Sequence, residues 1–496
     1  MTAPSEGRRS TGWMVAAAVL AVGLGWMAAA ASRSTAVPSA PAPPAEAAAA
    51  TRVVSPPQAA LGAGSCTSGG CHAAAVEGHA AWQSSYTVWA TRDPHARAEA
   101  VLHGPLAARI VALLAAADPT RPAVAAHEHA SCIGCHAPGP GRLAAEGVGC
   151  EACHGRAGDW LVAHTLSGWK AAGNTLGMID LADPFTCARQ CAGCHVGGPA
   201  TPEGLSREVS HDLIAAGHPR LAFDLRSFKR AEPPHWRDRF TAAAAAPTGS
   251  ATGNASLDPV AEWALGRLGA AHAFLELVTR QTQAPASAPA GGPADAWPEF
   301  TAFDCYACHR PPIAPADRGQ ATAARSRTRP LGVPGLQPMQ WALLDLVLPG
   351  DATAMLAAAD TRAWADPAAA PLGEIIERIE AARAHVGPAL AAVSAGDIAG
   401  GIIARVDPAI WDEAAAAHAA LTAVVDRAAA RGAAVAAVGP AVAALERLRT
   451  LLAFGTASPG HPVRFDSPRF DGPDRYDARA VAEELEAVVA AVRRLD

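Results

Sequence analysis

Cysteine and histidine recur in this chain in one fixed order. Four strings of the form Cys-x-x-Cys-His occupy Cys132–His136, Cys150–His154, Cys191–His195 and Cys305–His309, and a wider variant with four intervening residues occupies Cys66–His72. Two thiols at this spacing can bond to both vinyl groups of one porphyrin, while the adjacent imidazole binds its iron. The glycines of the wider string give its loop the freedom to bend. The sequence therefore predicts five covalently bound c-type haems.

Each predicted haem takes two thiols and one proximal histidine. The predicted attachment cysteines are Cys66, Cys71, Cys132, Cys135, Cys150, Cys153, Cys191, Cys194, Cys305 and Cys308. The predicted proximal iron ligands are His72, His136, His154, His195 and His309.

Two other uses of cysteine were weighed against haem attachment. Structural zinc also takes Cys-x-x-Cys pairs, but it has no need for a histidine directly after every second cysteine. Disulfides are common in exported proteins, yet ten of the eleven cysteines fall in the five strings. Only Cys187 is left over, and it is interpreted as a bystander thiol.

The supply of histidine points to a second axial ligand on several irons. Thirteen of the eighteen histidines lie outside the five strings, and ten of these precede residue 309. Met178 is the only methionine in the haem region, so methionine ligation can serve one haem at most. The favoured distal candidates are His95, His164, His211, His218 and His272. Lower-ranked candidates are His79, His103, His127, His129 and His235.

Chain position gives the reasons for this ranking. His95 follows Asp93-Pro94, which is expected to open a helix, and His164 lies ten residues past a proximal histidine. His211 and His218 are seven residues apart, which is two helical turns. In the region after residue 330, His385, His418 and His461 are expected to pack or face solvent instead of binding iron.

The N-terminus predicts export. Arg8-Arg9 precede an uncharged segment, residues 12–32, which is long enough to span a bilayer. We interpret residues 1–32 as a signal peptide or N-terminal membrane anchor and favour an uncleaved anchor in the inner membrane, with the bulk of the chain on the periplasmic side. The membrane is then a partner through this segment. Residues 33–60, rich in alanine and proline, read as a linker.

The rest of the chain divides by composition into two predicted domains. Residues 61–315 form a multihaem cytochrome c domain with low-complexity loops at 241–255 and 281–296, and residues 330–496 form an alanine-rich helical bundle. The expected fold class is mainly α with extensive loops, organised around covalent haems. We interpret the haem domain and the C-terminal bundle as two separate structural units.

Several helices are expected from caps and apolar periodicity. Asp258 and Pro259 suit the start of one helix, and Asp407-Pro408 and Asp477 suit the starts of two others. Gly439-Pro440 is expected to break or kink the helix before Ala441.

Charge excludes one class of partner. The net charge of −6 argues against nucleic acid binding. The chain has only two lysines, Lys170 and Lys229, among forty basic residues. Arginine is therefore available to pair with haem propionates through two hydrogen bonds at once.

These features resemble the cytochrome c-554/c-prime family, especially its long members with an N-terminal Cys-x4-Cys-His haem. The resemblance covers about residues 64–312 and rests on the haem strings and on the phrases Trp89 with Asp93–Ala98, Gly147–Gly155 with Trp160 and His164, His211–Leu221, and Pro298–Phe300 before Asp304. It implies a periplasmic electron carrier with mostly bis-histidine haems and one open haem. The fifth string and the long tail depart from the family pattern, so the electron donor and the open site are not carried over.

The sequence thus predicts electron transfer between closely packed haems, with redox proteins as partners and no catalytic residues. Only fourteen residues separate His136 from Cys150, which predicts that the second and third haems are neighbours. The main alternative is an enzyme in which one open haem acts on a small nitrogen or oxygen compound. The Cys-x-x-Cys-Lys string of pentahaem nitrite reductases is absent. A third alternative is a scaffold or gas sensor whose helical tail is the working part.

Overall fold

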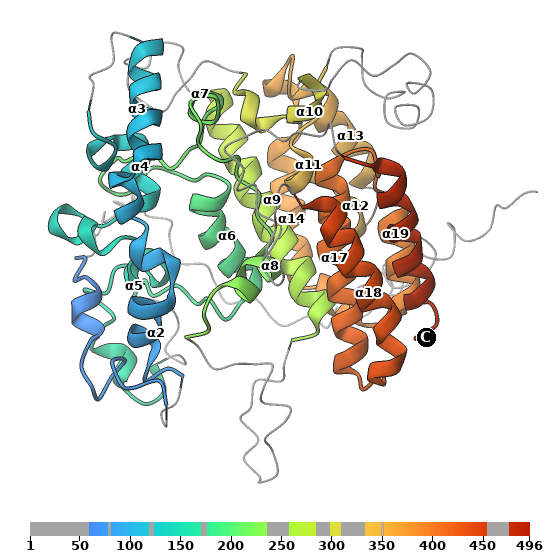
Figure 1. Cartoon of the computed structure of the whole chain (residues 1–496), viewed down its shortest axis with the longest axis horizontal. Helices are drawn as coiled ribbons and strands as arrows, with labels where there is room; N and C mark the ends of the chain where they lie inside the picture. The colour runs from blue at the N-terminus through green and yellow to red at the C-terminus, as the bar shows by residue number, and fades with distance from the viewer. Residues whose placement is uncertain are drawn as a thin grey trace, which may run out of the picture.

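The chain is mainly helical with extensive loops, as the sequence predicts (Figure 1). The computed structural model describes residues 59–77, 81–118, 124–169, 176–235, 257–283, 298–308, 333–348, 350, 352–453 and 476–496. Within these ranges no strand forms, and two isolated bridges join Gly198 to Arg207 and Phe303 to Leu336. The predicted anchor at 12–32, most of the linker and the loop at 241–255 lie outside the described residues.

The N-terminal half consists of short helices joined by loops. Its α-helices are α2 (Ser85–Arg92), α3 (Pro105–Ala117), α4 (Ala130–His136), α5 (Cys150–His154), α6 (Pro184–His195), α7 (His211–Ala215) and α8 (Leu225–Ala231). Its 3-10 turns are η1 (Ala63–Cys66), η2 (Pro94–Arg97), η3 (Ala100–His103), η4 (Ala126–Glu128), η5 (Gly141–Glu146) and η6 (Ala163–Thr165).

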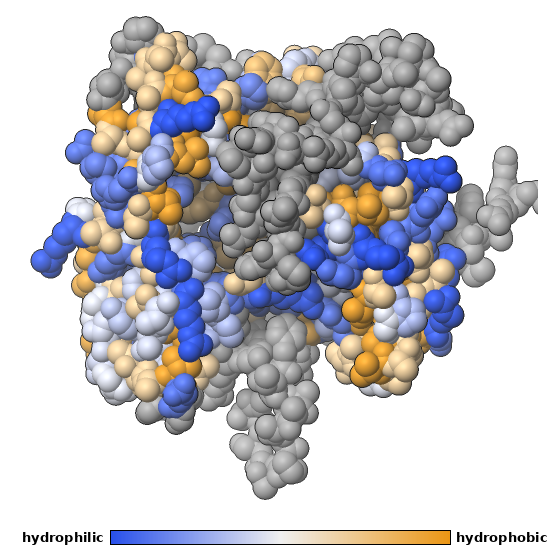
Figure 2. Space-filling view, in the orientation of Figure 1, coloured by the Kyte–Doolittle hydropathy of each residue, from blue (hydrophilic) through white to orange (hydrophobic). Residues whose placement is uncertain are grey.

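Few side chains form a core in this half. A small cluster joins α3 to α7 through Ile110, Leu114, Leu213 and Ala216. Large apolar side chains remain exposed, and Figure 2 shows apolar surface over α3. A fold with so little buried apolar surface fits a module whose interior is built around bound cofactors.

The long helix α9 (Pro259–Gln283) is the centre of the molecule. It begins as predicted, because the Asp258 carboxylate accepts hydrogen bonds from the backbone of Val260 and Ala261 at 2.9 and 3.3 Å. Gly269 allows α6 to approach closely, since a Cβ there would lie 2.5 Å from the Phe185 carbonyl oxygen. One side of α9 therefore packs on a haem-motif helix.

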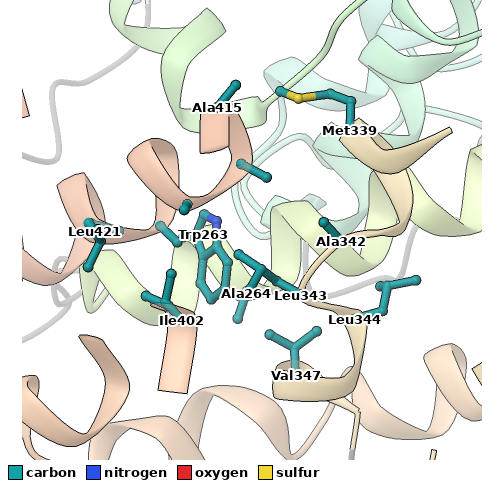
Figure 3. Packing of buried hydrophobic residues seen from close by; sticks show 14 of the residues in the cluster. Trp263, Ala264, Met339, Ala342, Leu343, Leu344, Val347, Ile402, Ala415 and Leu421 are labelled. Carbon is teal, nitrogen blue, oxygen red and sulfur yellow. The ribbon is translucent and has the colours of Figure 1, made fainter. Parts of the chain in front are cut away.

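The other side of α9 packs on the C-terminal helices. These are α10 (Cys305–Cys308), α11 (Pro338–Trp341), α12 (Leu344–Val347), α13 (Ala352–Arg362), α14 (Leu372–Ala382), α15 (Val386–Ala391), α16 (Ala395–Ile403), α17 (Trp411–Ala430), α18 (Val435–Leu452) and α19 (Ala478–Val492), with 3-10 turns η8 (Phe300–Ala302) and η9 (Pro367–Ala369). Trp263 of α9 is 1% exposed and lies among Leu343, Ile402 and Leu421 (Figure 3). The largest core thus includes both α9 and the described helices that follow residue 330.

Ion pairs also join the haem-motif region to the C-terminal helices. Arg220, just after α7, contacts Asp412 of α17 at 2.6 Å, and Arg226 of α8 contacts Asp426 of α17 at 2.8 Å. Arg226 also contacts Glu262 of α9 at 3.2 Å. Because each pair connects segments far apart in the sequence, the C-terminal helices are held against the haem-motif region by charge as well as by apolar packing.

Several predicted helix boundaries differ from the structure. Asp407 caps a turn by accepting from Ala409 at 2.8 Å, and α17 begins only at Trp411. Pro440 lies inside α18, which continues through it to Leu452, so the predicted break does not occur. Asp477 caps α19 as expected.

Two further boundaries need correction. The segment after Asp93 forms the two 3-10 turns η2 and η3 in place of one helix. The predicted loop at 281–296 starts later, because α9 extends to Gln283.

The described residues hold no single helix that is both long and apolar enough to cross a membrane. One bent pair, Pro94–His103 with Pro105–Ala117 at 55°, meets that test by length and composition only.

Candidate haem-binding sites

The haem strings lie at helix ends. Cys66 ends the turn η1, and the exact strings lie on α4, on α5, at the end of α6 and on α10. None of the eleven cysteines forms a disulfide. A short helix presents its two string cysteines one turn apart and directs the following histidine to the same side.

Three proximal histidines face a second histidine from a distant segment. Ring centroids are 6.2 Å apart for His72 and His164, 6.1 Å for His95 and His195, and 6.3 Å for His136 and His218. Two metal–nitrogen bonds of about 2 Å, plus about 1 Å from each nitrogen to its ring centre, also require about 6 Å. The spacing of all three pairs fits one iron between two imidazoles.

The outer ring nitrogens of these histidines are held by neighbouring groups. Nδ1 of five of the six lies near an oxygen atom: Trp82 O at 2.6 Å for His72, Ala98 O at 3.1 Å for His136, Leu161 O at 2.5 Å for His164, Pro219 O at 2.8 Å for His218 and the Asp93 carboxylate at 2.9 Å for His95. An Nδ1–H donor leaves Nε2 as the free lone pair for a metal.

Burial keeps several of these imidazoles neutral. It lowers the pKa of His195 to about 4, and it also lowers the pKa values of His136 and His218. A neutral imidazole is the form that binds iron. The exception is His95, whose pKa is raised by its hydrogen bond to Asp93.

A histidine that the sequence ranked low acts on the third string. Burial, with smaller effects of His235 and His72, lowers the pKa of His154 to about 4, and its buried Nδ1 makes no hydrogen bond. His235 lies on the chain just after α8, with Nδ1 3.4 Å from the Pro233 carbonyl. Of the two histidines that lower the pKa of His154, His235 has the larger effect. No local sequence signal marked His235, because its position relative to His154 depends on where α8 ends.

Thiols of different strings lie against one another. The Cys66 thiol contacts that of Cys150, which lowers the pKa of Cys66 to about 6, and the Cys194 thiol contacts that of Cys135, which lowers the pKa of Cys194 to about 7. Glu151 fixes the first contact, since its carboxylate accepts from the backbone of Leu61 and Gly62 at 3.0 and 2.6 Å. The first string thus adjoins the third, and the second adjoins the fourth.

A glycine fixes the segment of His95 beside the third string. Val148 donates to the His95 carbonyl at 3.0 Å, and the Trp89 indole donates to the Val148 carbonyl at 3.0 Å. Gly147 has φ +68°, and a Cβ there would lie 2.7 Å from the His95 carbonyl oxygen. Only glycine accommodates both the backbone angle and the approach.

Exposed apolar side chains surround the His72–His164 pair. Trp82 packs edge-on against His72 and is 42% exposed, while Val162 and Leu166, two residues on either side of His164, are 74% and 62% exposed. Apolar surface of this size is costly in water. An apolar group seated between the two histidines would cover it, which fits a porphyrin.

The fifth string borders a small pocket. Cys305 lines it together with apolar residues of several segments, including Phe274 and Leu277 of α9, and Arg220 is its one charged lining residue. Cys308 is exposed, and His309 lies outside the described residues.

The remaining two distal candidates are placed differently. His211 begins α7, where its backbone donates to Glu299 at 2.9 Å and its ring packs on Phe300 near the fifth string. His272 is 3% exposed, and its Nε2 and Nδ1 lie 3.0 Å from Glu380 and 3.4 Å from Glu276. Both of its nitrogens face carboxylates, which does not support an iron-binding role for His272.

Geometry among the described residues gives little support to zinc. One group of three potential ligands, Asp93, His95 and Glu232, is close enough to share an ion, and it contains no cysteine. Cys187 contacts Cys191 one turn along α6 and lies outside the paired strings. The cysteines do not gather into fourfold zinc sites.

Residues 65–155 match the family model described as cytochrome c554 and c-prime. The matched segment contains the first three haem strings. No curated protein and no solved structure matches the chain. The match supports a c-type cytochrome with covalently bound haem and a role in electron transfer.

Proposed function

We propose that this chain is an exported pentahaem cytochrome that passes electrons along closely packed, mostly bis-histidine haems to and from redox partner proteins. The observation that carries the proposal is the centroid spacing of 6.1 to 6.3 Å in three histidine pairs. Each pair joins a haem-string histidine to one from elsewhere in the chain. When bound, each haem supplies a one-electron iron couple, tuned by its axial ligands and burial.

The contacts between strings support a spatial order. The first string touches the third through Cys66 and Cys150, and the second touches the fourth through Cys135 and Cys194. The third and fourth also approach, since the pKa of Cys153 is raised by burial, then by the charge of Glu232, and then by the charge of Cys194. We propose the order first, third, fourth, second for these four haems. In this order the fourth haem lies between the second and third, so these two are not the direct neighbours that the sequence predicts.

Export and anchoring belong to the same proposal. Residues 12–32 would hold the chain in the inner membrane, or be removed after export, with the haem-binding region on the periplasmic side. Attachment of c-type haem outside the cytoplasm fits this location.

The test is haem content together with spin state. The full-length chain should be expressed with a c-type haem attachment system and the mass of the product measured, with five haems expected. Electron paramagnetic resonance of the oxidised protein should be dominated by low-spin signals. A product without haem would refute the proposal. A high-spin signal that shifts on adding nitrite, hydroxylamine or nitric oxide would favour the enzyme.

A further inference from the structure

One short segment after α6 contacts two haem strings at once. Gly134 lies in the second string, on α4, and a Cβ there would lie 1.8 Å from the Ser206 carbonyl oxygen. Gly193 lies in the fourth string, on α6, and a Cβ there would lie 3.3 Å from Nη1 of Arg207. Two successive residues, Ser206 and Arg207, therefore pack against the glycines of two different strings.

The Arg207 side chain is held in place at this junction. Its Nε donates to the Pro199 carbonyl at 2.8 Å, and its backbone carbonyl accepts from the Gly198 N–H at 2.9 Å. The guanidinium also donates to the Cys194 thiol of the fourth string, and that thiol contacts Cys135 of the second. The positive charge of Arg207 therefore lies where the second and fourth strings meet.

This charge acts on the attachment thiols of both strings. Contact with Cys135 lowers the pKa of Cys194, burial opposes this effect, and the charge of Arg207 lowers the pKa further, to about 7. Contact with Cys194 and burial raise the pKa of Cys135, and the charge of Arg207 opposes them. A haem attached at either string would be exposed to the same positive charge.

We infer that Arg207 is a charge shared by the second and fourth haems, and that it raises the reduction potentials of both. The inference rests on the proposed function, in which redox partner proteins supply and remove the electrons. Reduction of Fe³⁺ to Fe²⁺ adds one electron and removes one unit of positive charge, so a fixed cation nearby favours the reduced state. In the proposed order these two haems adjoin at one end of the row. Arg207 thus favours electrons at that end.

Two substitutions separate the charge of Arg207 from its packing. Arg207→Gln removes the charge and should lower the potentials of the second and fourth haems together. Arg207→Lys changes the shape of the side chain but keeps the charge, so it should leave both potentials close to those of the parent protein. A purely structural role predicts similar damage in both variants.

The measurement is a potentiometric titration of the purified, haem-loaded protein, followed by its visible spectrum. The step of each haem is assigned as the one that disappears when both cysteines of its string are replaced by serine. At a fixed solution potential, Arg207→Gln should lower the ratio of reduced to oxidised haem at both strings at least about threefold, which is about 28 mV for one electron. The first haem, at the other end of the proposed row, is the internal reference.

Arg378→Gln is the control for loss of a positive charge elsewhere. Arg378 lies on α14 and pairs with Glu374 at 3.3 Å, so both assigned steps should stay unchanged. The inference alone would be overturned by unshifted steps in Arg207→Gln, by an equal shift in Arg207→Lys or Arg378→Gln, or by loss of a haem in Arg207→Gln, which would indicate a role in attachment. A parent protein without a haem at the second or fourth string would instead show that the proposed function has failed.

Discussion

The contact between Asp93 and His95 allows a quantitative test of the bis-histidine assignment. Asp93 is 1% exposed, and its carboxylate lies 2.9 Å from His95 Nδ1. Replacing it with asparagine removes one negative charge and keeps a side chain that can still accept from the His95 backbone. The turn η2 should therefore survive the substitution.

The expected shift in reduction potential follows from the distance between the Asp93 carboxylate and the iron. Crossing the imidazole ring and one metal–nitrogen bond of about 2 Å puts iron about 7 Å from the carboxylate. Unit charges about 7 Å apart interact by about 2 kcal/mol at an effective dielectric constant of about 20. A tenfold change is about 1.4 kcal/mol, or about 59 mV for one electron. Asp93→Asn should therefore raise the potential of the His95–His195 haem by about 100 mV.

The ionisation of the neighbouring Glu232 determines the pH at which this assay should be run. Burial, and then the charge of Asp93, raises the pKa of Glu232 to about 7. Near neutral pH, loss of the Asp93 charge would let Glu232 ionise and offset part of the shift. Titration at pH 8.5, where Glu232 is ionised in both proteins, isolates the contribution of Asp93.

A matched histidine–carboxylate pair provides the control. Glu99 lies 2.7 Å from Nε2 of His103, whose ring stacks on His127 at 4.4 Å, too close for an iron between them. Glu99→Gln should leave every haem potential unchanged. No upward shift in Asp93→Asn at pH 8.5, with all haems present, would refute the assignment of His95 as an iron ligand.

Three other outcomes follow from the structure. His164→Ala should convert the haem at His72 from low spin to high spin, seen as a new high-spin resonance, because it removes the imidazole that lies 6.2 Å from the His72 ring. Gly134→Ala should lower thermal stability by about 1–3 kcal/mol, since its Cβ would lie 1.8 Å from the Ser206 carbonyl oxygen. Burial lowers the pKa of His418 from 6.5 to about 4, so unfolding by urea should cost about 1–2 kcal/mol less at pH 5 than at pH 7.

The sign of the pH effect follows from which state takes up the proton. His418 stays neutral in the folded protein at pH 5, whereas the unfolded chain binds a proton below about pH 6.5. Stability is therefore full above pH 6.5 and declines as pH falls toward 4. His418→Leu should flatten this dependence, and an unchanged slope would contradict the argument.

Matched variants check the other two outcomes. His103→Ala removes a histidine that faces no haem string and should leave the spin state unchanged. Gly64→Ala adds a methyl group where nothing lies within 4 Å, so it should leave stability unchanged. A high-spin signal in the first, or an equal loss of stability in the second, would count against the structural explanation.

The sequence alone determined the features that depend on neighbouring residues. The predicted haem attachment is encoded within five to seven residues, because the two thioether bonds and the one axial bond would be made by side chains on the same turn. The starts of α9 and α19 were equally predictable, since Asp258 and Asp477 bond to backbone groups two or three residues away.

Tertiary structure decided which histidines meet and what the C-terminal helices do. His72 and His164 come together through packing of segments far apart in the chain, while His272, on a well-predicted helix, is directed toward Glu380. A histidine has the same local pattern whether it meets iron or a carboxylate. The long-range contacts of α6, α8 and α17 with α9 determine which of these groups a histidine meets. The spacing of residues along the chain does not predict those contacts.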